Sequence, residues 1–555
     1  MRIACIGGGP GASLLALLLH RTTGHEVDVY ERSPRGATYG FGVVFSRFSL
    51  ARLRRAAPDV VAALLGDGAR WDDVEVRRDG ERTRSSGHGF AAVERKLLLG
   101  TLHRLAEEAG ARLHFETEAD AAELLTRYDL VVAADGAGSR TRPAFGTELG
   151  AKSATCGGRY AWFGVDREFD AMTFLFAESE YGPLGAHVYP YGPGRSTFLV
   201  ELGEETWRNS PFTDGHALAP GQNDEQAMEF CARTFAADLE GATLLGNGSR
   251  WLSFPWISAE RWSTGRLVGL GDAVHTAHFS VGSGTTMALE DAVELARSLA
   301  GATEDGEALG AALAAYESAR RPAVESVQQA AWASQRMWEH PAEHAGLDTD
   351  ALMIRLLSRT GQSPADLLLR LDPELGKLPK SPLTALPRTP VRTLAGPAAA
   401  LGYAVAFGPE DAVLVAEGAP LPPEGHRGPL LVEFDAATAD LRDEFAAAAR
   451  LHAVRHARPD ALIGVLLRSP GPAEEPVSRV VEAVRSLVRV TSVDVVAVAP
   501  GDAPPAANRV AQMAVAERLY SAGPPIAYVC GPDEVSQGWT HVQAGRADAV
   551  WTTTA

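Results

Sequence analysis

A glycine-rich turn, Gly7-Gly8-Gly9-Pro10-Gly11-Ala12, follows an apolar strand and precedes a helix, and Glu31 ends the next predicted strand. Glycines in such a turn let the backbone approach a pyrophosphate, and the N-terminus of the following helix favours negative charge. An acidic residue about 20 positions further on can bind a ribose hydroxyl. The spacing predicts a dinucleotide site, whose members are Gly7, Gly9, Gly11, Ala12 in the third glycine position, Glu31 and the adjoining Arg32.

Two later strands each end beside an aspartate. The first ends at Asp135-Gly136, and the second ends at Gly271-Asp272 and leads into the loop Gly282-Ser283-Gly284. Aspartates at these positions can accept hydrogen bonds from sugar hydroxyls, and the amides of a glycine loop can face a phosphate or the edge of a flavin ring. Each strand end alone is equally compatible with a capped turn. The three elements together favour FAD as the bound dinucleotide.

Histidine and tyrosine side chains supply candidate groups for a substrate. His275 and His278 follow the second aspartate, so we expect both near the same site. His278 is the stronger candidate for a catalytic, substrate-facing group, although a histidine in such a loop often satisfies local backbone groups instead. His187, Tyr189 and Tyr191 alternate along one predicted strand, so they share one sheet face, which either faces substrate or packs in the core. We assign neither a metal site nor a covalent nucleophile.

The elements that position these residues indicate an α/β protein. Residues 3–31 read as strand, helix and strand, the opening βαβ unit of a Rossmann-like fold. Runs rich in aromatic and β-branched residues between Arg159 and Glu201 indicate a mostly antiparallel sheet that would carry the substrate. The 555 residues exceed what one core usually organises, and a composition with 46% apolar and 22% charged residues is typical of a globular protein.

Composition shifts predict two domains. We expect an FAD-binding domain over residues 1–378, with the substrate sheet inserted at about 155–255. A proline-rich stretch at 379–397 predicts a linker. Strands and helices alternate over 398–555, which indicates an α/β domain with parallel strands.

Charge and hydropathy exclude several classes of partner. The net charge of −18 and the lack of a long Lys/Arg cluster argue against nucleic-acid binding. No apolar run approaches the roughly 20 residues needed to cross a bilayer, and the N-terminal run is too short and too rich in glycine for a signal peptide. The four cysteines are far apart, which fits a reducing compartment. We therefore expect a soluble cytoplasmic protein without a membrane partner.

The first two-thirds of the chain, to about residue 375, resembles the single-component FAD-dependent aromatic hydroxylases, the family of p-hydroxybenzoate hydroxylase. The phrases TYGFGVVFS, GHGFAAVERKLLL, AHVYPYGPGRSTFLVE and HTAHFSVGSGT are similar to the branch that contains salicylyl-CoA 5-hydroxylase and 2-aminobenzoyl-CoA monooxygenase/reductase. The resemblance implies that FAD is surrounded by Gly7, Gly9, Ala12, Glu31, Arg95, Asp135 and Asp272, with Arg95 at the start of a helix.

The resemblance also implies a reaction. NADH or NADPH would reduce FAD without a Rossmann domain of its own, and a flavin hydroperoxide formed with molecular oxygen would attack an electron-rich ring. The branch implies an ortho-hydroxy or ortho-amino aryl thioester, bound to CoA or to a carrier protein. Phe41 and Thr286 depart from the branch, which usually has Trp and Lys there. The alternatives are a hydroxylase of a free indole or phenolic compound and a non-catalytic flavin-binding scaffold, and a homodimer is left open.

The C-terminal part resembles, in fragments, the barrel of the old yellow enzyme family. The similar phrases include DEFAAAARLHAVRHARPDALIGVLL and RVAQMAVAERLYSAGPPIAYVCG. A closed barrel of eight βα units typically needs about 250 residues, so we expect a truncated (β/α) barrel-like domain. The chain ends in Thr552-Thr553-Thr554-Ala555 where that family usually has a Gly-Arg pair, and its catalytic histidines and tyrosine find no match. We therefore expect no FMN and a structural or partner-binding role.

Overall fold

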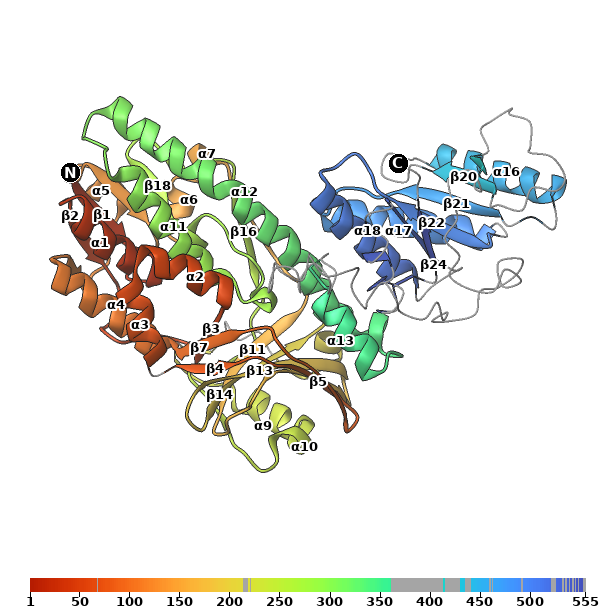
Figure 1. Cartoon of the computed structure of the whole chain (residues 1–555), viewed down its shortest axis with the longest axis horizontal. Coiled ribbons are helices and arrows are strands. Elements are labelled where there is room, and N and C mark those ends of the chain that lie inside the picture. Colours follow the sequence, from red (N-terminus) through yellow and green to blue (C-terminus); the bar gives the residue numbers. More distant parts are fainter. Residues whose placement is uncertain are drawn as a thin grey trace. The chain divides into compact units, whose positions relative to one another are not determined.

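The computed structural model describes residues 1–360 except 67, 213–217 and 220, and, beyond 360, 413–414, 430–434, 441–458, 461, 463–490, 493–520, 526–531 and scattered positions in 534–552. The chain divides into two compact units, Met1–Ala331 and Trp332–Ala555 (Figure 1). The predicted domain end near 378 and the linker at 379–397 lie outside the described residues, so they stay predictions.

A six-stranded sheet forms the base of the first unit. Its strand order is β17-β18-β9-β1-β2-β8. The bounds are β1 (Arg2–Ile6), β2 (Glu26–Tyr30), β8 (Arg112–His114), β9 (Leu130–Ala133), β17 (Ser263–Thr264) and β18 (Leu267–Gly269). All neighbours are parallel except β17 and β18. The predicted Rossmann-like opening is confirmed, and the strand ends that precede Asp135 and Asp272 lie beside each other in β9 and β18.

Helices cover both faces of this sheet, because its strands are apolar on both sides. Ile3 and Cys5 face a core that includes α1 (Pro10–Thr22), α4 (Arg95–Ala109), α11 (Gly284–Leu299) and part of α12 (Gly306–Glu339). Ala4 and Ile6 face a smaller core with α5 (Ala121–Leu124). Figure 1 shows α1 and α11 side by side, so the turns that begin these two helices open on the same region.

A seven-stranded sheet forms the second layer. Its order is β15-β11-β14-β13-β12-β5-β6. The bounds are β5 (Val74–Arg78), β6 (Glu81–Ser85), β11 (Arg159–Val165), β12 (Met172–Ser179), β13 (Gly182–Gly192), β14 (Arg195–Leu202) and β15 (Leu244–Leu245). The runs predicted between Arg159 and Glu201 form β11–β14 and pair antiparallel, as predicted. The parallel pairing of β12 with β5, from far upstream, was not predicted.

The two faces of the seven-stranded sheet differ in composition. One face carries Phe163, Val188 and Phe198, which pack with α9 (Glu225–Thr234) and α10 (Ala236–Leu239). Cross-strand pairing places His187 opposite Leu199 and Tyr189 opposite Thr197 on the other face. This second face is turned toward the flavin-fold elements and carries polar side chains.

A three-stranded sheet, β3-β7-β4, adjoins the polar face. It consists of β3 (Gly42–Ser46), β7 (Phe90–Glu94) and β4 (Ala69–Trp71). Two helices, α2 (Arg47–Ala56) and α3 (Pro58–Gly66), connect β3 to β4 in the chain. The hydroxyl of Tyr189 donates to the carbonyl of Gly42 at 2.9 Å. This bond ties the small sheet to the seven-stranded sheet.

The second unit contains a six-stranded parallel sheet whose order, β19-β20-β21-β22-β23-β24, is the order of the chain. Its strands are β19 (Val413–Leu414), β20 (Leu430–Phe434), β21 (Ile463–Arg468), β22 (Val495–Ala499), β23 (Ile526–Cys530) and β24 (Ala549–Thr552). The helices α16 (Leu441–Ala457), α17 (Glu474–Val490) and α18 (Pro505–Tyr520) alternate with them. The predicted parallel α/β arrangement is confirmed, β20 was not predicted, and the barrel-like form stays a prediction.

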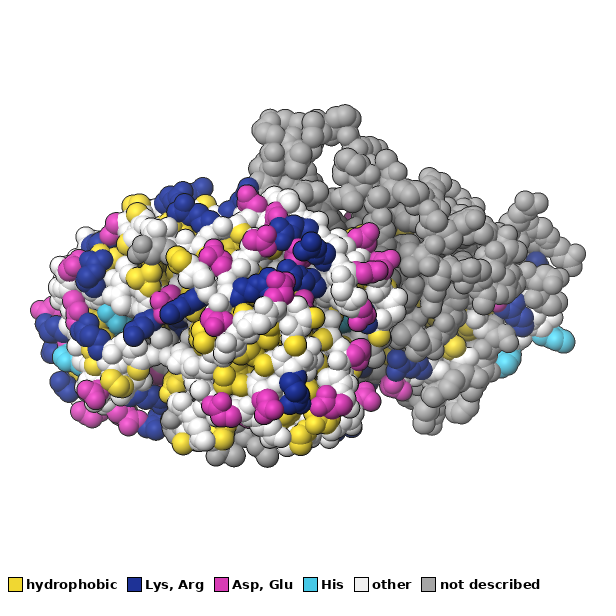
Figure 2. Space-filling view, turned by 90° about the horizontal axis from the view of Figure 1, so that it is seen from below, with side chains coloured by type: hydrophobic (Ala, Val, Ile, Leu, Met, Phe, Trp, Pro, Cys, Tyr) yellow, Lys and Arg dark blue, Asp and Glu magenta, His cyan; other side chains and the backbone are white. Residues whose placement is uncertain are grey.

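The surface and the helices carry two further observations. On the face of the first unit drawn in Figure 2, basic and acidic side chains are interspersed. Across the described ranges, no helix combines the length and hydropathy that a membrane crossing requires. Within the same ranges, no three His, Cys, Asp or Glu side chains gather as metal ligands would.

Candidate active site

The glycine turn between β1 and α1 leaves open amides at the start of a buried helix. Gly7 has φ +98°, and a Cβ there would lie 2.4 Å from the carbonyl oxygen of Ala134, so only glycine fits. Gly9 is the N-cap of α1 and provides no side-chain cap, and a Cβ on Gly9 would meet open space. The first amides of α1 are therefore available to an anion such as a pyrophosphate.

Gly11, rather than Ala12, allows the close helix packing beside this turn. A Cβ on Gly11 would lie 2.4 Å from Cδ2 of Leu270 and 3.0 Å from the carbonyl oxygen of Ala288. Ala12 is buried in the main core instead. The glycine at position 11 thus brings α1 against α11 and against the strand end that precedes Asp272.

Glu31 lies beside the glycine turn, as predicted. Its carboxylate accepts hydrogen bonds from the amides of Gly8 and Ser33, both at 2.8 Å. Arg32 is exposed. A residue that the sequence did not single out, His103 of α4, hydrogen-bonds through Nε2 with the carbonyl of Gly8 at 2.8 Å. His103 therefore fixes the turn from the opposite side to Glu31.

Asp135 is partly used by the protein and partly open. Its Oδ2 accepts from the amides of Arg140 and Thr141 at 2.9 and 3.1 Å, while its Oδ1 is buried without a partner among the described residues. Gly136 next to it has φ +75° and makes the turn. The guanidinium of Arg142 donates to the carbonyls of Ala137 and Ala273, which joins the two strand-end loops.

Asp272 and Arg95 form a second open pair of charges. Burial raises the pKa of Asp272, against the opposing effect of His275 and Arg95. Burial likewise lowers the pKa of Arg95, which begins α4 as predicted. In the described residues neither side chain makes a hydrogen bond within the protein. A half-buried acceptor and a half-buried donor, neither hydrogen-bonded in the described part of the chain, fit a polar ligand such as FAD.

The N-terminus of α11 is also uncapped. Ser283 is its N-cap but makes no capping bond, and its Oγ is buried without a partner in the part of the chain that the structure describes. Gly282 has φ +63°, which turns the chain into the helix, and a Cβ on Gly284 would meet open space. The predicted loop 282–284 therefore offers free amides on a second helix that packs against α1.

His275 is held by a buried network of hydrogen bonds and ion pairs, and not by contacts with the seven-stranded sheet. Its Nε2 lies 2.8 Å from Oδ2 of Asp291, and Nε of Arg320 donates to Oδ1 of the same carboxylate at 2.8 Å. Burial raises the pKa of Asp291, but His275 and Arg320 outweigh burial and keep it below its ordinary value. Asp291 also accepts from the amide of Gly271 at 3.1 Å. This network braces the turn that carries Asp272.

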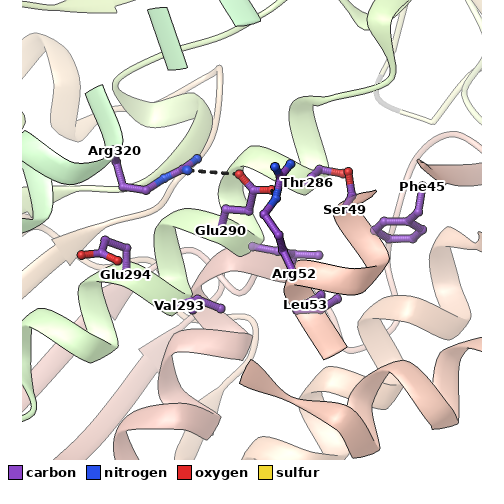
Figure 3. A pocket seen from close by; sticks show the side chains of 10 residues that line it. Phe45, Ser49, Arg52, Leu53, Thr286, Glu290, Val293, Glu294 and Arg320 are labelled. Atoms are coloured by element: carbon purple, nitrogen blue, oxygen red, sulfur yellow. Dashed lines mark hydrogen bonds and ion pairs between the residues drawn. The ribbon is translucent and has the colours of Figure 1, made fainter. Parts of the chain in front are cut away.

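The network continues to the surface along a cavity between α2 and α11. Glu290 pairs with Arg320 at 3.1 Å and with Arg52 at 2.6 Å, and Figure 3 shows Glu290 between these two arginines. The cavity has a volume of about 180 Å³. Thr286 lines it where the hydroxylase branch usually has Lys.

His278 contacts the sheet face through a carboxylate that the sequence did not identify. Its Nδ1 lies 2.9 Å from Oγ of Ser280 and accepts from the amide of Ser280 at 3.4 Å. Burial lowers the pKa of His278 to about 3, so the ring is neutral and carries its proton on Nε2. That nitrogen lies 3.6 Å from Oε2 of Glu201.

Glu201 joins two of the predicted histidines. Its Oε1 lies 2.7 Å from Nε2 of His187, and both side chains are buried. We call His187, Glu201 and His278 the histidine–glutamate cluster. Glu201 stands opposite Gly185 in the β13–β14 ladder, two positions from the partner of His187, so the register alone brings them together.

Aromatic rings surround the histidine–glutamate cluster. Phe279 lies 4.7 Å from the ring of Tyr160 and 5.8 Å from that of Phe254, and Phe254 lies 4.9 Å from His278. Burial raises the pKa of Tyr160 to about 12, and the charge of Asp272 adds to the effect. The cluster therefore lies next to the open Asp272 and is shielded from water.

Tyr189 and Tyr191 share the face of His187, as predicted, but both are covered by the segment that enters β3. Tyr189 bonds to Gly42, and the ring of Tyr191 lies 6.5 Å from that of Phe41. A Cβ on Gly164 would lie 2.6 Å from the ring of Phe41, so this glycine makes room for the ring. Phe41 thus lies against the sheet where the branch usually has Trp.

Replacing His278 with glutamine should make the fold less sensitive to acid. Because burial lowers the pKa of His278 from 6.5 to about 3, the unfolded chain takes up the proton first as the pH falls. The folded state therefore loses up to about 1.4 kcal/mol per pH unit below about pH 6.5. Unfolding free energies at pH 7 and pH 5 should differ less in His278→Gln than in the wild type. The exposed His456→Gln should keep the wild-type difference, and an unchanged difference in His278→Gln would refute the assignment.

Comparisons with known proteins agree with this geometry. Residues 1–331 match the sequence family described as FAD binding domain. Salicyloyl-CoA 5-hydroxylase of a Streptomyces species is 42% identical over 342 residues, which cover 61% of this chain and 66% of the relative. The 3-hydroxy-4-methyl-anthranilyl-(aryl-carrier protein) 5-monooxygenase of Streptosporangium sibiricum is 41% identical over 59% of this chain and 86% of its own. Protodeoxyviolaceinate monooxygenase of Chromobacterium violaceum is 31% identical over 59% of this chain and 85% of its own.

A solved structure shares the fold. A mutant form of 2-methyl-3-hydroxypyridine-5-carboxylic acid oxygenase superposes with a TM-score of 0.50 at 18% identity, and covers 66% of this chain and 97% of its own. At this identity the likeness concerns the fold alone. It supports the α/β architecture with mixed sheets.

Proposed function

The chain belongs to the FAD-binding-domain family, and on this premise we propose that it is a monooxygenase that hydroxylates an aromatic thioester. The observation that carries the proposal is the histidine–glutamate cluster, set among aromatic rings beside the open Asp272. Relatives at 42% and 41% identity are named for a CoA thioester and for a carrier-bound aryl group. We therefore propose an ortho-hydroxy or ortho-amino aryl group on CoA or on a carrier protein as the substrate.

The residues around the two strand-end loops would hold FAD. Gly9 and the first amides of α1 would receive the pyrophosphate, and Glu31 a ribose hydroxyl. Asp135, Asp272 and Arg95 have free donors or acceptors for the rest of the molecule. Bound FAD, reduced by NADH or NADPH, would supply the activation of molecular oxygen and its transfer to the ring.

The histidine–glutamate cluster would act on the substrate ring. A ring hydroxyl or amine becomes more electron-donating as its proton is accepted, and a positioned acid–base group typically contributes about 10²–10⁴-fold to such a step. The carboxylate of Glu201 can accept that proton, and neutral His278, whose Nε2 faces the carboxylate, can position it. The rings of Tyr160, Phe254 and Phe279 would exclude water from the same space.

A substrate panel tests the proposal. Salicylate and anthranilate would be offered as free acids, as CoA thioesters and as carrier-protein thioesters, with NADH and NADPH compared as reductants. We expect a thioester to accelerate NAD(P)H oxidation and to gain one oxygen atom. Product mass, oxygen uptake and hydrogen peroxide would be measured together.

Two results would contradict it. Hydroxylation of free indoles or phenols alone would favour the second candidate function, a hydroxylase of a free aromatic compound. The 31% identity with protodeoxyviolaceinate monooxygenase supports this candidate. Retention of FAD without substrate-coupled oxidation of NAD(P)H would favour a flavin-binding scaffold.

The second unit is proposed to be structural or partner-binding. Its strands follow the chain order of an FMN barrel, but Thr552 and Thr553 stand at the last strand's end where that family usually has a Gly-Arg pair. We expect one FAD and no FMN per chain when the flavins released from intact protein are separated and quantified. Stoichiometric FMN, or reductase activity that survives removal of FAD, would overturn this assignment.

A further inference from the structure

A basic groove lies between α2 and the edge strand β4, outside the site described above. Its walls include Arg47, Leu50 and Arg54 of α2, Arg70 and Trp71 of β4, and Phe90 of β7. Its volume is about 500 Å³, within the range of ligand sites. Arg47, Leu50 and Arg54 are spaced by three and four residues, so one face of α2 forms the wall.

The charge of this groove contrasts with that of the chain. The protein carries a net charge of −18, yet the sequence of α2, RFSLARLRRA, contains four arginines and no acid. The groove also contains an acidic side chain, Asp72, whose Oδ1 lies 3.8 Å from Nη2 of Arg47. Arg70 donates to the carbonyl of Leu65, and neither Arg54 nor Arg70 has an acidic partner among the described residues. Such unpaired guanidinium groups favour a multiply charged anion.

Trp71 connects the groove to the polar face of the seven-stranded sheet. Its side chain is 8% exposed, and its indole N–H has no hydrogen-bond partner in the described part of the chain. Its ring stacks on those of Phe90 and Tyr189, with distances of 5.7 and 6.2 Å between the ring centroids. Tyr189 in turn lies near Arg95, whose charge acts on the pKa of the tyrosine. The groove is therefore one aromatic layer away from the polar face of the seven-stranded sheet.

We infer that this groove binds the phosphates of the coenzyme A moiety of the substrate. The inference rests on the proposed function, and it names the part of the thioester that the active site itself does not recognise. Coenzyme A carries a pyrophosphate and a 3′-phosphate, which match Arg47, Arg54 and Arg70. NAD(P)H offers similar phosphates, whereas a carrier protein would present one phosphate and a broad surface to a concave groove.

The test compares two forms of one aryl substrate, 2-hydroxybenzoyl-CoA and the N-acetylcysteamine thioester of the same acid, which has no phosphate. In the double variant Arg54→Ala/Arg70→Ala, KM for the CoA thioester should rise at least about tenfold. The value of kcat and the KM for the truncated thioester should be unchanged. Arg55→Ala is the matched control, because Arg55 is an exposed arginine of the same helix that does not line the groove.

Direct binding keeps this test separate from the proposed function. Coenzyme A alone should bind the wild-type holoenzyme more weakly at high salt, and the double variant should lose at least about tenfold in affinity. If no thioester is turned over but this binding difference holds, the proposed function fails and the groove assignment stands. A rise in KM for NADH or NADPH, an effect confined to carrier-bound substrate, or equal coenzyme A affinity in both proteins would overturn the groove assignment.

Discussion

Asp272→Ala should lose most of its FAD and with it the yellow colour of the protein. Asp272 is a half-buried carboxylate without a partner among the described residues, and Arg95 and Arg142 both act on its pKa. Losing a charge-assisted hydrogen bond costs about 1.5–3 kcal/mol, which corresponds to roughly 10- to 100-fold weaker binding. Titration of the apoprotein with FAD, followed by flavin fluorescence, would measure this change.

Two controls separate lost binding from lost folding. Because burial raises the pKa of Asp272, its ionised form destabilises the empty protein, so Asp272→Ala should unfold at the same or a higher temperature without FAD. Asp272→Asn keeps the shape of the side chain and should lose less affinity. If Asp272→Ala bound FAD as tightly as the wild type, this loop would have no part in holding the cofactor.

Glu201→Gln should retain FAD but lower kcat by about 100-fold or more. Glu201 is the shared carboxylate of the histidine–glutamate cluster, and an amide can neither accept a proton nor balance a protonated histidine. NAD(P)H oxidation should continue in part and release hydrogen peroxide instead of hydroxylated product. Product formation and peroxide, measured in the same reaction across a range of pH, would show the uncoupling.

The matched control is Glu178→Gln, an exposed glutamate of β12 in the same sheet. It should leave kcat, coupling and the pH profile unchanged. Wild-type coupling in Glu201→Gln would mean that the carboxylate only fills space between the two histidines. Loss of FAD from that variant would instead place Glu201 in cofactor binding.

The parts of the site that could be predicted are those encoded locally. Gly7 and Glu31 have positions that follow from the βαβ unit, so the turn, the helix and the acid appear together in the sequence. Asp135 and Asp272 follow the ends of neighbouring strands, β9 and β18, as the strand-end pattern predicts. The alternation of strands and helices in the C-terminal unit is equally local.

Glu201 could not be predicted, because its importance depends on strand register. In the sequence it ends an apolar strand and looks like an exposed glutamate. Pairing of β14 with β13 turns it toward His187, and the loop after β18 then brings His278 to its other oxygen. The close contact at Gly11 could not be predicted either, since it depends on Ala288 of α11, far away in sequence.

The sheet of the second unit grows in chain order, so each of its inner strands pairs with the strands immediately before and after it in sequence. No ladder joins distant strands within the described residues, unlike the pairing of β12 with β5 in the first unit. Loss or duplication of a βα unit at an edge would leave every remaining ladder intact, as in modular repeat proteins. Such an architecture gives evolution a route to change the length of this unit one module at a time.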